Sequence, residues 1–280
     1  MEFRSFDPSS MQHALDELIE HRWALRSLFV WREQDRARLV TLNRLESLLL
    51  QVEYADADKL LSEDRKKGFL LDQESPIRIT YALDRDGGAL CILTFHHAAV
   101  DGWSIAILAN ELLRLYSAFL NKTALPVFQT DAKPPVRSNL ISVETWREYL
   151  QELPDPTPLR DLFQPQSQSV AYAQQGIQLS PEETAAVNRW CKVERVTLSS
   201  LVHCVWGMTL GYLSGRETSV FGSIDSGRRH LDGGEVAVGM FMTLLPIKVA
   251  ASETLQLGEF VRRFQSQYWE LLQHLSLIHI

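Results

Sequence analysis

Residues 94–104 place two adjacent histidines and an aspartate–glycine pair between an apolar run and a helical pattern. The apolar run from Ala89 to Phe95 is typical of a short buried strand, and the pattern from Ile105 to Phe119 is typical of a helix. His96-His97 is therefore predicted at the end of a strand, with Asp101-Gly102 at the turn that opens the helix. This strand–turn–helix segment constrains the chain more than any other stretch of the sequence.

The spacing His-His-x-x-x-Asp-Gly specifies four positions of this segment. By average residue usage, a chance match in a chain of 280 residues is on the order of one in a thousand. The segment resembles the signature of the condensation-domain superfamily, the acyl-transfer domains of nonribosomal peptide synthetases. Trp103-Ser104, which follows the signature, is most similar to the form found in peptide-bond-forming condensation domains.

Two further stretches are similar to motifs of the same family. The first resembles Arg-His-Glu-x-Leu-Arg-Thr-x-Phe: it matches at Leu25, Arg26 and Phe29, and departs at His21, Arg22 and Trp23. The second resembles Val-Gly-x-Phe-x-Asn-Thr-Leu-Pro: it matches at Gly239, Phe241, Leu245 and Pro246, and departs at Thr243 and Leu244. Together the three motifs extend the resemblance over nearly the whole chain.

The resemblance implies an α/β protein with the two-lobed fold of chloramphenicol acetyltransferase, here with an incomplete second lobe. A proline-rich breaker at 154–158 places the boundary between the lobes. We expect an N-terminal lobe at 1–153, a linker at 154–168 and a partial C-terminal lobe at 169–280. Because family members are longer at both ends, we expect residues 1–280 alone to be inactive and marginally soluble.

The motif also implies roles for single residues. His97 is the residue expected to face the substrate, as general base or as a group that positions the amine. His96 is expected to point back into the sheet, because successive strand residues face opposite sides. Asp101 is expected to be a buried structural acid that needs an arginine partner, and Arg228 and Arg26 are the two candidates.

Other residues are expected to support the site. Gly102 is expected to allow a tight turn and close backbone approach, and the helix that begins beside it favours developing negative charge. The remaining supporting residues, placed by their motifs, are Trp103, Ser104, Gly239 and Phe241.

The function implied by the resemblance is condensation-type acyl transfer. A carrier-bound acyl or peptidyl thioester would condense with a carrier-bound aminoacyl group to form an amide bond. The expected partners are the upstream donor and downstream acceptor peptidyl-carrier domains, with an adenylation domain in the same assembly. The 4'-phosphopantetheine arms would belong to the carriers, so we expect no cofactor bound by this chain. Three alternatives stay open: a carrier- or coenzyme-A-dependent O-acyltransferase, an epimerase-like relative, and a non-catalytic carrier-docking domain.

Composition excludes several other classes of protein. The net charge of −7 argues against a nucleic-acid partner, which would favour a basic face. The three cysteines share no metal or disulfide spacing and suit a reducing cytosol. No third ligand accompanies His97 and Asp101, so we expect no metal. With no signal pattern at the N-terminus and no apolar run of membrane-spanning length, we expect a cytoplasmic protein without a membrane partner.

Two periodic patterns predict which side chains form the core. In the strand expected at Pro76 to Asp84, Ile77, Ile79 and Tyr81 alternate with the polar Arg78 and Thr80. The composition of residues 84–88 predicts a hairpin turn after this strand. In the helix expected after Thr197, the apolar residues at i, i+3 and i+4 spacing predict a buried stripe. That stripe contains Leu198, Leu201, Val202, Val205, Trp206, Thr209, Leu210 and Leu213. The same helix is expected to be capped by Thr197 and ended by Gly215, and Ser180 with Glu183 predicts the start of the helix before it.

Overall fold

Contacts between residues divide the chain into two compact units. The computed structural model describes residues 1–31, 38–53, 56–129, 147–149, 151, 176–228, 231, 233–250 and 255–273. The first unit comprises Met1–Val136 and Ser226–Met242, and the second comprises Arg137–Asp225 and Thr243–Ile280. The segment 226–242, which the sequence assigned to the second lobe, thus packs with the first unit. The predicted linker at 154–168 lies outside the described residues, and the predicted lobe boundaries stay a prediction.

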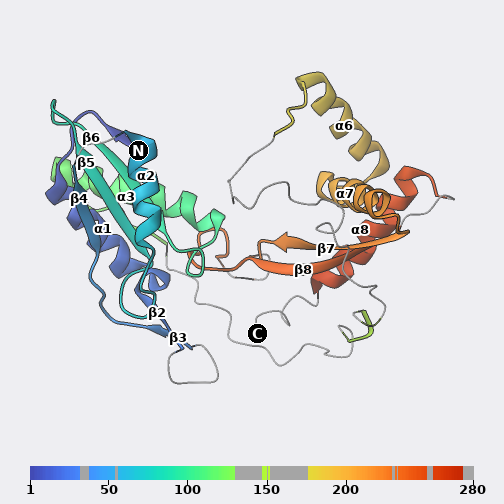
Figure 1. Ribbon diagram of the computed structural model, residues 1–280, viewed down its shortest axis with the longest axis horizontal. Coiled ribbons are helices and arrows are strands. Elements are labelled where there is room, and N and C mark those ends of the chain that lie inside the picture. Colours follow the sequence, from blue (N-terminus) through green and yellow to red (C-terminus); the bar gives the residue numbers. More distant parts are fainter. Residues whose placement is uncertain are drawn as a thin grey trace. The chain divides into compact units, whose positions relative to one another are not determined.

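A four-stranded sheet forms the centre of the first unit, in the order β1-β6-β5-β4 (Figure 1). Its strands are β1 Glu2–Phe3, β4 Leu48–Val52, β5 Ile77–Leu83 and β6 Ala89–Phe95. β4 runs parallel to β5, whereas β5 and β6 form an antiparallel pair. The turn between them is closed by Asp84, whose carboxylate accepts hydrogen bonds from the Asp86 and Gly88 amides at 2.9 and 2.7 Å. This confirms the turn and the two strands predicted to lead into the histidines.

Three helices accompany this sheet, each begun by an aspartate cap. They are α1 Pro8–His21, α2 Ala57–Lys67 and α3 Gly102–Asn121. The carboxylates of Asp7, Asp56 and Asp101 accept a backbone amide in the first turn of each helix, which satisfies a donor that the helix itself leaves unpaired. A short 3-10 helix η1 and an antiparallel strand pair complete the unit: η1 Trp23–Arg26, β2 Ser27–Val30 and β3 Arg38–Thr41.

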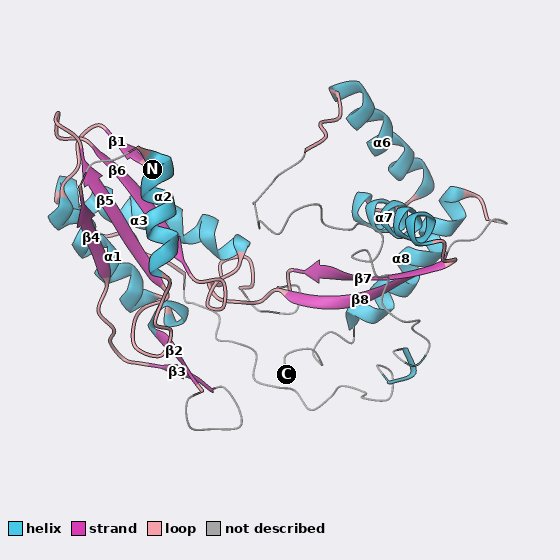
Figure 2. Cartoon of the chain, viewed as in Figure 1, coloured by secondary structure: helices cyan, strands magenta, loops and turns pink. Residues whose placement is uncertain are grey.

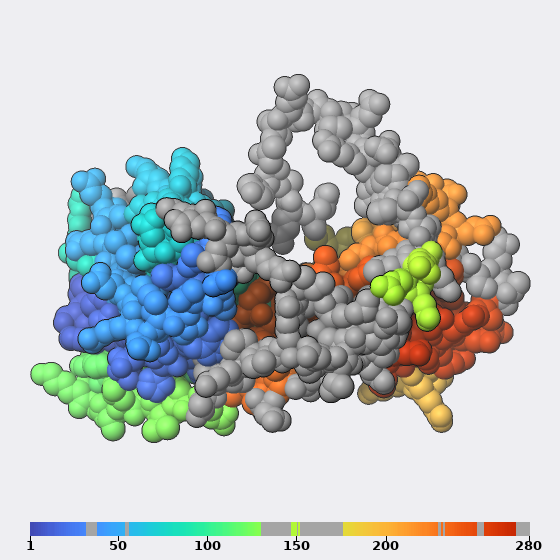
Figure 3. All heavy atoms as spheres, turned by 90° about the horizontal axis from the view of Figure 1, so that it is seen from below, coloured from blue at the N-terminus to red at the C-terminus, as the bar shows by residue number. Residues whose placement is uncertain are grey.

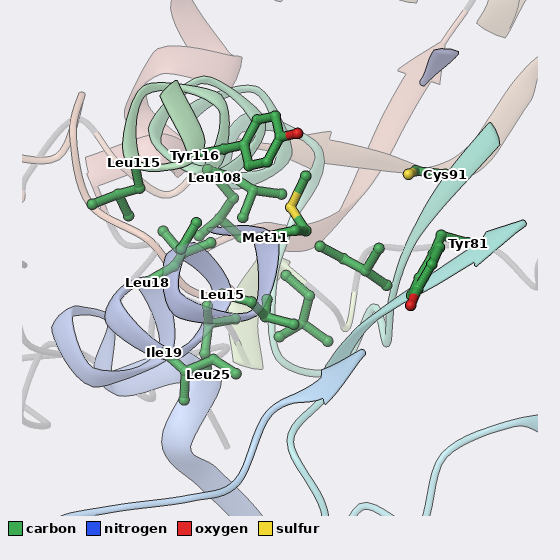
Figure 4. Close-up of a cluster of buried hydrophobic side chains, with 14 of the residues drawn as sticks. Met11, Leu15, Leu18, Ile19, Leu25, Tyr81, Cys91, Leu108, Leu115 and Tyr116 are labelled. Atoms are coloured by element: carbon green, nitrogen blue, oxygen red, sulfur yellow. The ribbon is translucent and has the colours of Figure 1, made fainter. Parts of the chain in front are cut away.

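The apolar core of the first unit lies between one face of the sheet and helices α1 and α3 (Figures 2 and 4). Buried side chains of α1, such as Leu15 and Leu18, meet Leu108 and Leu115 of α3. β5 contributes the residues predicted for its apolar face, Ile77, Ile79 and Tyr81. Helix α2 covers the opposite, polar face of the sheet, where it contacts β6.

The segment after α3 packs back on the outside of this core. Phe128 lies edge-on to the His21 ring, with centroids 6.0 Å apart, and the Arg114 guanidinium lies 5.4 Å from its centroid. In the space-filling view the green chain around and after α3 lies against the blue N-terminal elements (Figure 3). This contact ties the described part of the connector after α3 to α1.

The second unit contains helices and a two-stranded antiparallel sheet among its described residues. Its elements are α6 Pro181–Glu194, α7 Leu198–Ser214, β7 Thr218–Asp225, β8 Thr243–Ala250 and α8 Leu257–Gln273. Ser180 and Glu183 form a capping box at α6, Thr197 caps α7, and Gly215 ends α7 with φ +65°. These local signals were predicted from the sequence and are confirmed.

Helix α7 turns a different face inward from the one that its apolar pattern predicts. Val202, Val205 and Trp206 are about half exposed, whereas Cys204 and Gly207 are buried. A Cβ atom at Gly207 would overlap the Val249 side chain, so only the glycine side of the helix allows this approach to β8. The predicted apolar stripe is therefore wrong for most of its members, and Leu210 is its buried member.

Within the described ranges, no single helix is long and apolar enough to cross a membrane. α6 and α7 pass that test together by length and composition, with a bend of 101° between them.

Candidate active site

The turn after β6 presents the two histidines differently. The His96 amide donates to the Pro76 carbonyl at 2.8 Å, and the His96 carbonyl accepts from the Ala99 amide at 3.0 Å. His96 Nδ1 accepts a further hydrogen bond from the Ala98 amide at 3.1 Å. His96 is half-buried, whereas His97 is exposed. The turn thus holds His96 against the protein and leaves the His97 side chain accessible.

Asp101 is fully buried and caps helix α3. Its carboxylate accepts from the Ser104 amide at 2.9 Å, from Ser104 Oγ at 2.8 Å and from the Phe241 amide at 3.2 Å. Arg228 Nη2 lies 2.7 and 2.9 Å from the two carboxylate oxygens. Burial raises the pKa of this carboxyl, but the hydrogen bonds from Ser104 and the Arg228 charge outweigh burial, so the pKa lies below its usual value. Asp101 is therefore an ionised structural acid at neutral pH.

Arg228 is the arginine that pairs with Asp101. Its Nη1 donates to the Gly234 and Ala237 carbonyls at 2.9 and 2.6 Å, so the same side chain also organises the 226–242 segment. Its guanidinium lies over the Phe241 ring, 4.6 Å from the centroid. Arg26, the other candidate, instead donates to the Ile19 and Leu42 carbonyls at 3.1 and 2.7 Å. The structure thus selects one of two partners that the sequence left open.

Ser104 and Gly239 join the start of α3 to the 226–242 segment. The Gly239 amide donates to Ser104 Oγ at 3.1 Å, and the Gly239 carbonyl accepts from the Asp101 amide at 3.2 Å. A Cβ at Gly239 would lie 3.0–3.1 Å from the Phe241 and Trp23 rings, so a larger residue would have to displace them. The motif around Gly239 thus serves as the packing partner of the Asp101 turn.

Gly102 and Trp103 stand on the outer side of this turn. Gly102 is exposed, has no positive φ, and a Cβ there would meet nothing within 4 Å. Gly102 is the first residue of α3 and follows the extended Asp101 cap, so its own backbone does not require glycine, and the expected close approach at Gly102 stays a prediction. Trp103 is 54% exposed, and its indole N–H donates to the Glu235 carbonyl at 3.0 Å. Open space at this helix start is compatible with the approach of a ligand.

Sequence reasoning missed a second buried cluster behind the histidines. Arg78 and Thr80 were predicted to form the polar side of β5, yet each is only 3% exposed. They face Asp64 of α2, whose carboxylate accepts from Arg78 Nε at 3.0 Å and from Thr80 Oγ1 at 2.7 Å. Strict alternation with polar residues predicts a solvent face, and an aspartate in a polar helix carries no sign of burial. The one available signal was the pairing of opposite charges on neighbouring elements.

The described part of the chain holds no group of three histidine, cysteine, aspartate or glutamate side chains arranged to bind a metal ion. The cysteines at 91, 191 and 204 are buried free thiols. Burial raises the pKa of Cys91 to about 11 and that of Cys204 to about 12, so neither is a thiolate nucleophile at neutral pH.

Comparison with known proteins agrees with this geometry. The chain is 27% identical over 294 residues to chondramide synthase cmdD of Chondromyces crocatus, and the match covers 98% of the chain. It is 24% identical over 280 residues to bacitracin synthase 3 of Bacillus licheniformis, and that match covers 92% of the chain. The chain spans only 7% of the length of the first synthase and 4% of the length of the second.

Two solved structures are similar to the fold. The first condensation domain of the calcium-dependent antibiotic synthetase, in complex with a substrate analogue, superposes with a TM-score of 0.71 at 18% identity. The epimerization domain from the third module of tyrocidine synthetase B superposes with a TM-score of 0.67 at 16% identity. The superpositions cover 98% and 99% of this chain but 68% and 67% of the two solved chains, in agreement with the predicted partial second lobe.

These structures confirm the chloramphenicol-acetyltransferase-like fold predicted from the motifs. Residues 3–277 match the family model of the condensation domain. With its signature turn, its Asp101–Arg228 pair and this match over nearly its whole length, the chain belongs to the condensation-domain family.

Proposed function

We propose that this chain catalyses amide-bond formation between two carrier-bound substrates in nonribosomal peptide synthesis. The donor is an acyl or peptidyl thioester, and the acceptor is an aminoacyl group. The observation that carries the proposal is the placement of His97: an exposed imidazole on a turn whose backbone is held on one side by His96 and on the other by the buried Asp101 cap.

In this reaction the acceptor amine attacks the thioester carbonyl carbon. The carbon–nitrogen bond forms, the carbon–sulfur bond breaks, and the donor carrier's thiol leaves with a proton. The amine loses a proton in the same sequence, and an exposed imidazole is suited to accept or orient that proton near neutral pH. His97 is therefore the proposed catalytic residue, as general base or as the group that positions the amine.

The remaining motif residues act as its support. Asp101, Ser104 and Arg228 fix the start of α3, and Gly239 and Phe241 pack against it. The Asp101 carboxylate is not available as a general base, because both of its oxygens already accept hydrogen bonds and its pKa is lowered. The open helix start at Gly102 and Trp103 would lie beside the reacting groups.

The proposed partners are an upstream donor carrier and a downstream acceptor carrier, with an adenylation domain in the same assembly. Their 4'-phosphopantetheine arms would bring the thioesters to the site as substrates, so the chain itself needs no cofactor. A cytoplasmic location stays part of the proposal. The likeness to chondramide synthase cmdD supports an assembly of this type, although the chain spans only 7% of that synthase.

An epimerization domain shares the fold, so an epimerase-like activity is the second candidate. The fold is also compatible with two other functions, O-acyl transfer and non-catalytic docking of carrier domains. The distinction lies in the product: an amide, an ester, an inverted α-carbon or none.

The test is a condensation assay on the parent polypeptide with both carriers loaded, with product identity and stereochemistry followed by mass spectrometry and chiral chromatography. We expect amide product from the wild type and a loss of roughly 100- to 10,000-fold in rate for His97→Ala. His13→Ala, at a histidine of α1 in the first unit, is the control and should keep the wild-type rate. Amide formation by His97→Ala at the wild-type rate would remove His97 from the mechanism, and inversion without amide formation would favour the epimerase-like alternative.

A further inference from the structure

The polar face of the sheet in the first unit carries a buried carboxylate with donors from two strands. Asp64 Oδ2 accepts from Thr94 Oγ1 at 2.5 Å and from Arg78 Nη2 at 3.1 Å, in addition to the Arg78 and Thr80 bonds to Oδ1. Burial raises the pKa of Asp64, but the bonds from Arg78, Thr94 and Thr80 outweigh it and hold the pKa below its usual value. This cluster pins α2 to β5 and β6 two residues before the histidine turn begins.

Arg78 extends the cluster to the end of α2. Its Nη2 donates to the Asp64 carbonyl at 2.6 Å, and its Nη1 donates to the Gly68 carbonyl. Gly68 has φ +62°, a conformation that lets the chain leave the helix toward the sheet. The next residue, Phe69, lies under the Arg78 guanidinium, with Cζ 4.3 Å from the ring centroid. A cation over a half-buried aromatic face fixes the ring orientation.

Phe69 in turn contacts His96. The two rings are perpendicular, at 88°, with centroids 6.1 Å apart, which is a favoured arrangement for aromatic pairs. His96 Nδ1 accepts the Ala98 amide, so this nitrogen carries no proton and the imidazole is the Nε2–H tautomer when neutral. The His96 side chain therefore supports the backbone on the far side of His97, as the side chain in an Asx-turn does.

We infer that Phe69 is a positioning residue for His97: its ring, clamped by Arg78, fixes the His96 imidazole, and His96 orders the turn that carries His97. This inference rests on the proposed catalytic role of His97 for its kinetic consequence, although its structural part does not. Without the ring, His96 has other rotamers available, the Ala98 amide loses its acceptor in a fraction of molecules, and His97 occupies its productive geometry less often. Small losses of geometry are costly in rate when catalysis depends on orientation.

The chain contains a matched control in Phe128. Like Phe69 it is half-buried, lies beside an arginine (Arg114, 5.4 Å) and meets a histidine edge-on (His21, 6.0 Å and 81°). His21 lies at the end of α1, away from the turn at 96–99. Phe69→Leu and Phe128→Leu therefore remove equivalent rings and differ in which histidine loses its neighbour.

The first measurement is independent of activity. In protein labelled with 15N-histidine, long-range proton–nitrogen spectra of the wild type should show His96 Nδ1 as an unprotonated acceptor, and ring protons of Phe69 should show a cross-relaxation contact with those of His96. In Phe69→Leu the His96 signals should move toward the average of the two tautomers, whereas Phe128→Leu should leave them unchanged. A wild-type spectrum with His96 Nδ1 protonated, or without the ring contact, would overturn the inference before any variant is made.

The second measurement is the condensation assay. Phe69→Leu should lower kcat roughly 10-fold with an unchanged KM for the acceptor carrier, Phe69→Tyr should keep the rate within about 3-fold because the ring is retained, and Phe128→Leu should match the wild type. Equal losses in Phe69→Leu and Phe128→Leu would show a general packing effect and sink the inference, as would unchanged kinetics with displaced His96 signals. A failure of the proposed function looks different, because the wild type would then form no amide while the His96 signals still respond to Phe69.

Discussion

Two buried aspartate–arginine clusters in the first unit use the same chemistry over very different distances along the chain. In both clusters, burial disfavours the ionised form of the aspartate, and hydrogen bonds from several donors favour it and lower the pKa. Asp64 and Arg78 are 14 residues apart and join α2 to the adjacent strands. Asp101 and Arg228 are 127 residues apart and join the start of α3 to a segment that follows β7.

The difference shows what each cluster is for. The Asp64–Arg78 cluster closes a short loop and stiffens one face of a sheet that the core already holds together on its other face. The Asp101–Arg228 cluster holds a segment whose flanking residues belong to the other unit, and its bonds to Gly234 and Ala237 make that segment dependent on one side chain. The entropic cost of closing a loop grows only slowly with its length, so a separation of 127 residues does not prevent Asp101 and Arg228 from pairing. The specificity of this pair must therefore come from its own hydrogen bonds.

The largest effect on stability is expected at the Asp101–Arg228 pair. Asp101→Asn and Arg228→Ala should each lower the free energy of unfolding by about 3–5 kcal/mol, because each leaves a buried partner uncompensated. Denaturant unfolding of both single variants and of the double variant gives the coupling. The double variant should lose much less than the sum of the two. Fully additive losses would contradict the pairing. Arg26→Ala is the control, because Arg26 does not contact Asp101 and donates to the Leu42 carbonyl instead.

A smaller effect on stability is expected at the Asp64–Arg78 cluster. Asp64→Asn should lower the free energy of unfolding by about 3 kcal/mol, at the lower end of the range for a broken buried pair. One of the Thr80 and Thr94 hydroxyls can still donate to the amide oxygen, and the other can accept from the amide N–H. Hydrogen exchange should show the loss confined to α2, β5 and β6, whereas Arg228→Ala should expose the amides of 233–242. If Asp64→Asn instead opened the 226–242 segment, the two clusters would not be independent.

The smallest effect is expected in the pH dependence of stability. Both folded-state pKa values lie below the usual value of 3.8, so each unfolded carboxyl binds its proton at a higher pH than the folded one. The contribution of each pair is therefore complete above about pH 4 and is lost as the pH falls through the folded-state pKa. Unfolding free energies measured between about pH 5 and 2 should fall less steeply in Asp101→Asn or Asp64→Asn than in the wild type. An unchanged acid slope would mean that folding does not lower the pKa of the substituted carboxyl.

Several features of the site were predictable because their causes are local. Asp101 caps α3 through the amide of Ser104, three residues along the chain, and the apolar run of β6 ends at the His-His pair. The need for a partner to a buried Asp101 followed from the cost of an isolated charge. The identity of the partner did not, because both Arg26 and Arg228 have the reach and charge to serve.

Residue order alone was enough to predict the strands and turn that lead into the histidines, the caps at Ser180 and Thr197, and the family of the chain. It was not enough to predict that Arg228 pairs with Asp101, that Arg78 and Thr80 face a buried carboxylate, or that α7 turns Gly207 rather than Trp206 toward the sheet. Caps and turns depend on hydrogen bonds between residues a few positions apart, and the sequence contains all of their atoms in one short stretch. Whether a face of a helix or strand is buried depends on which other element packs against it, and the residues of that element lie tens to hundreds of positions away in the sequence.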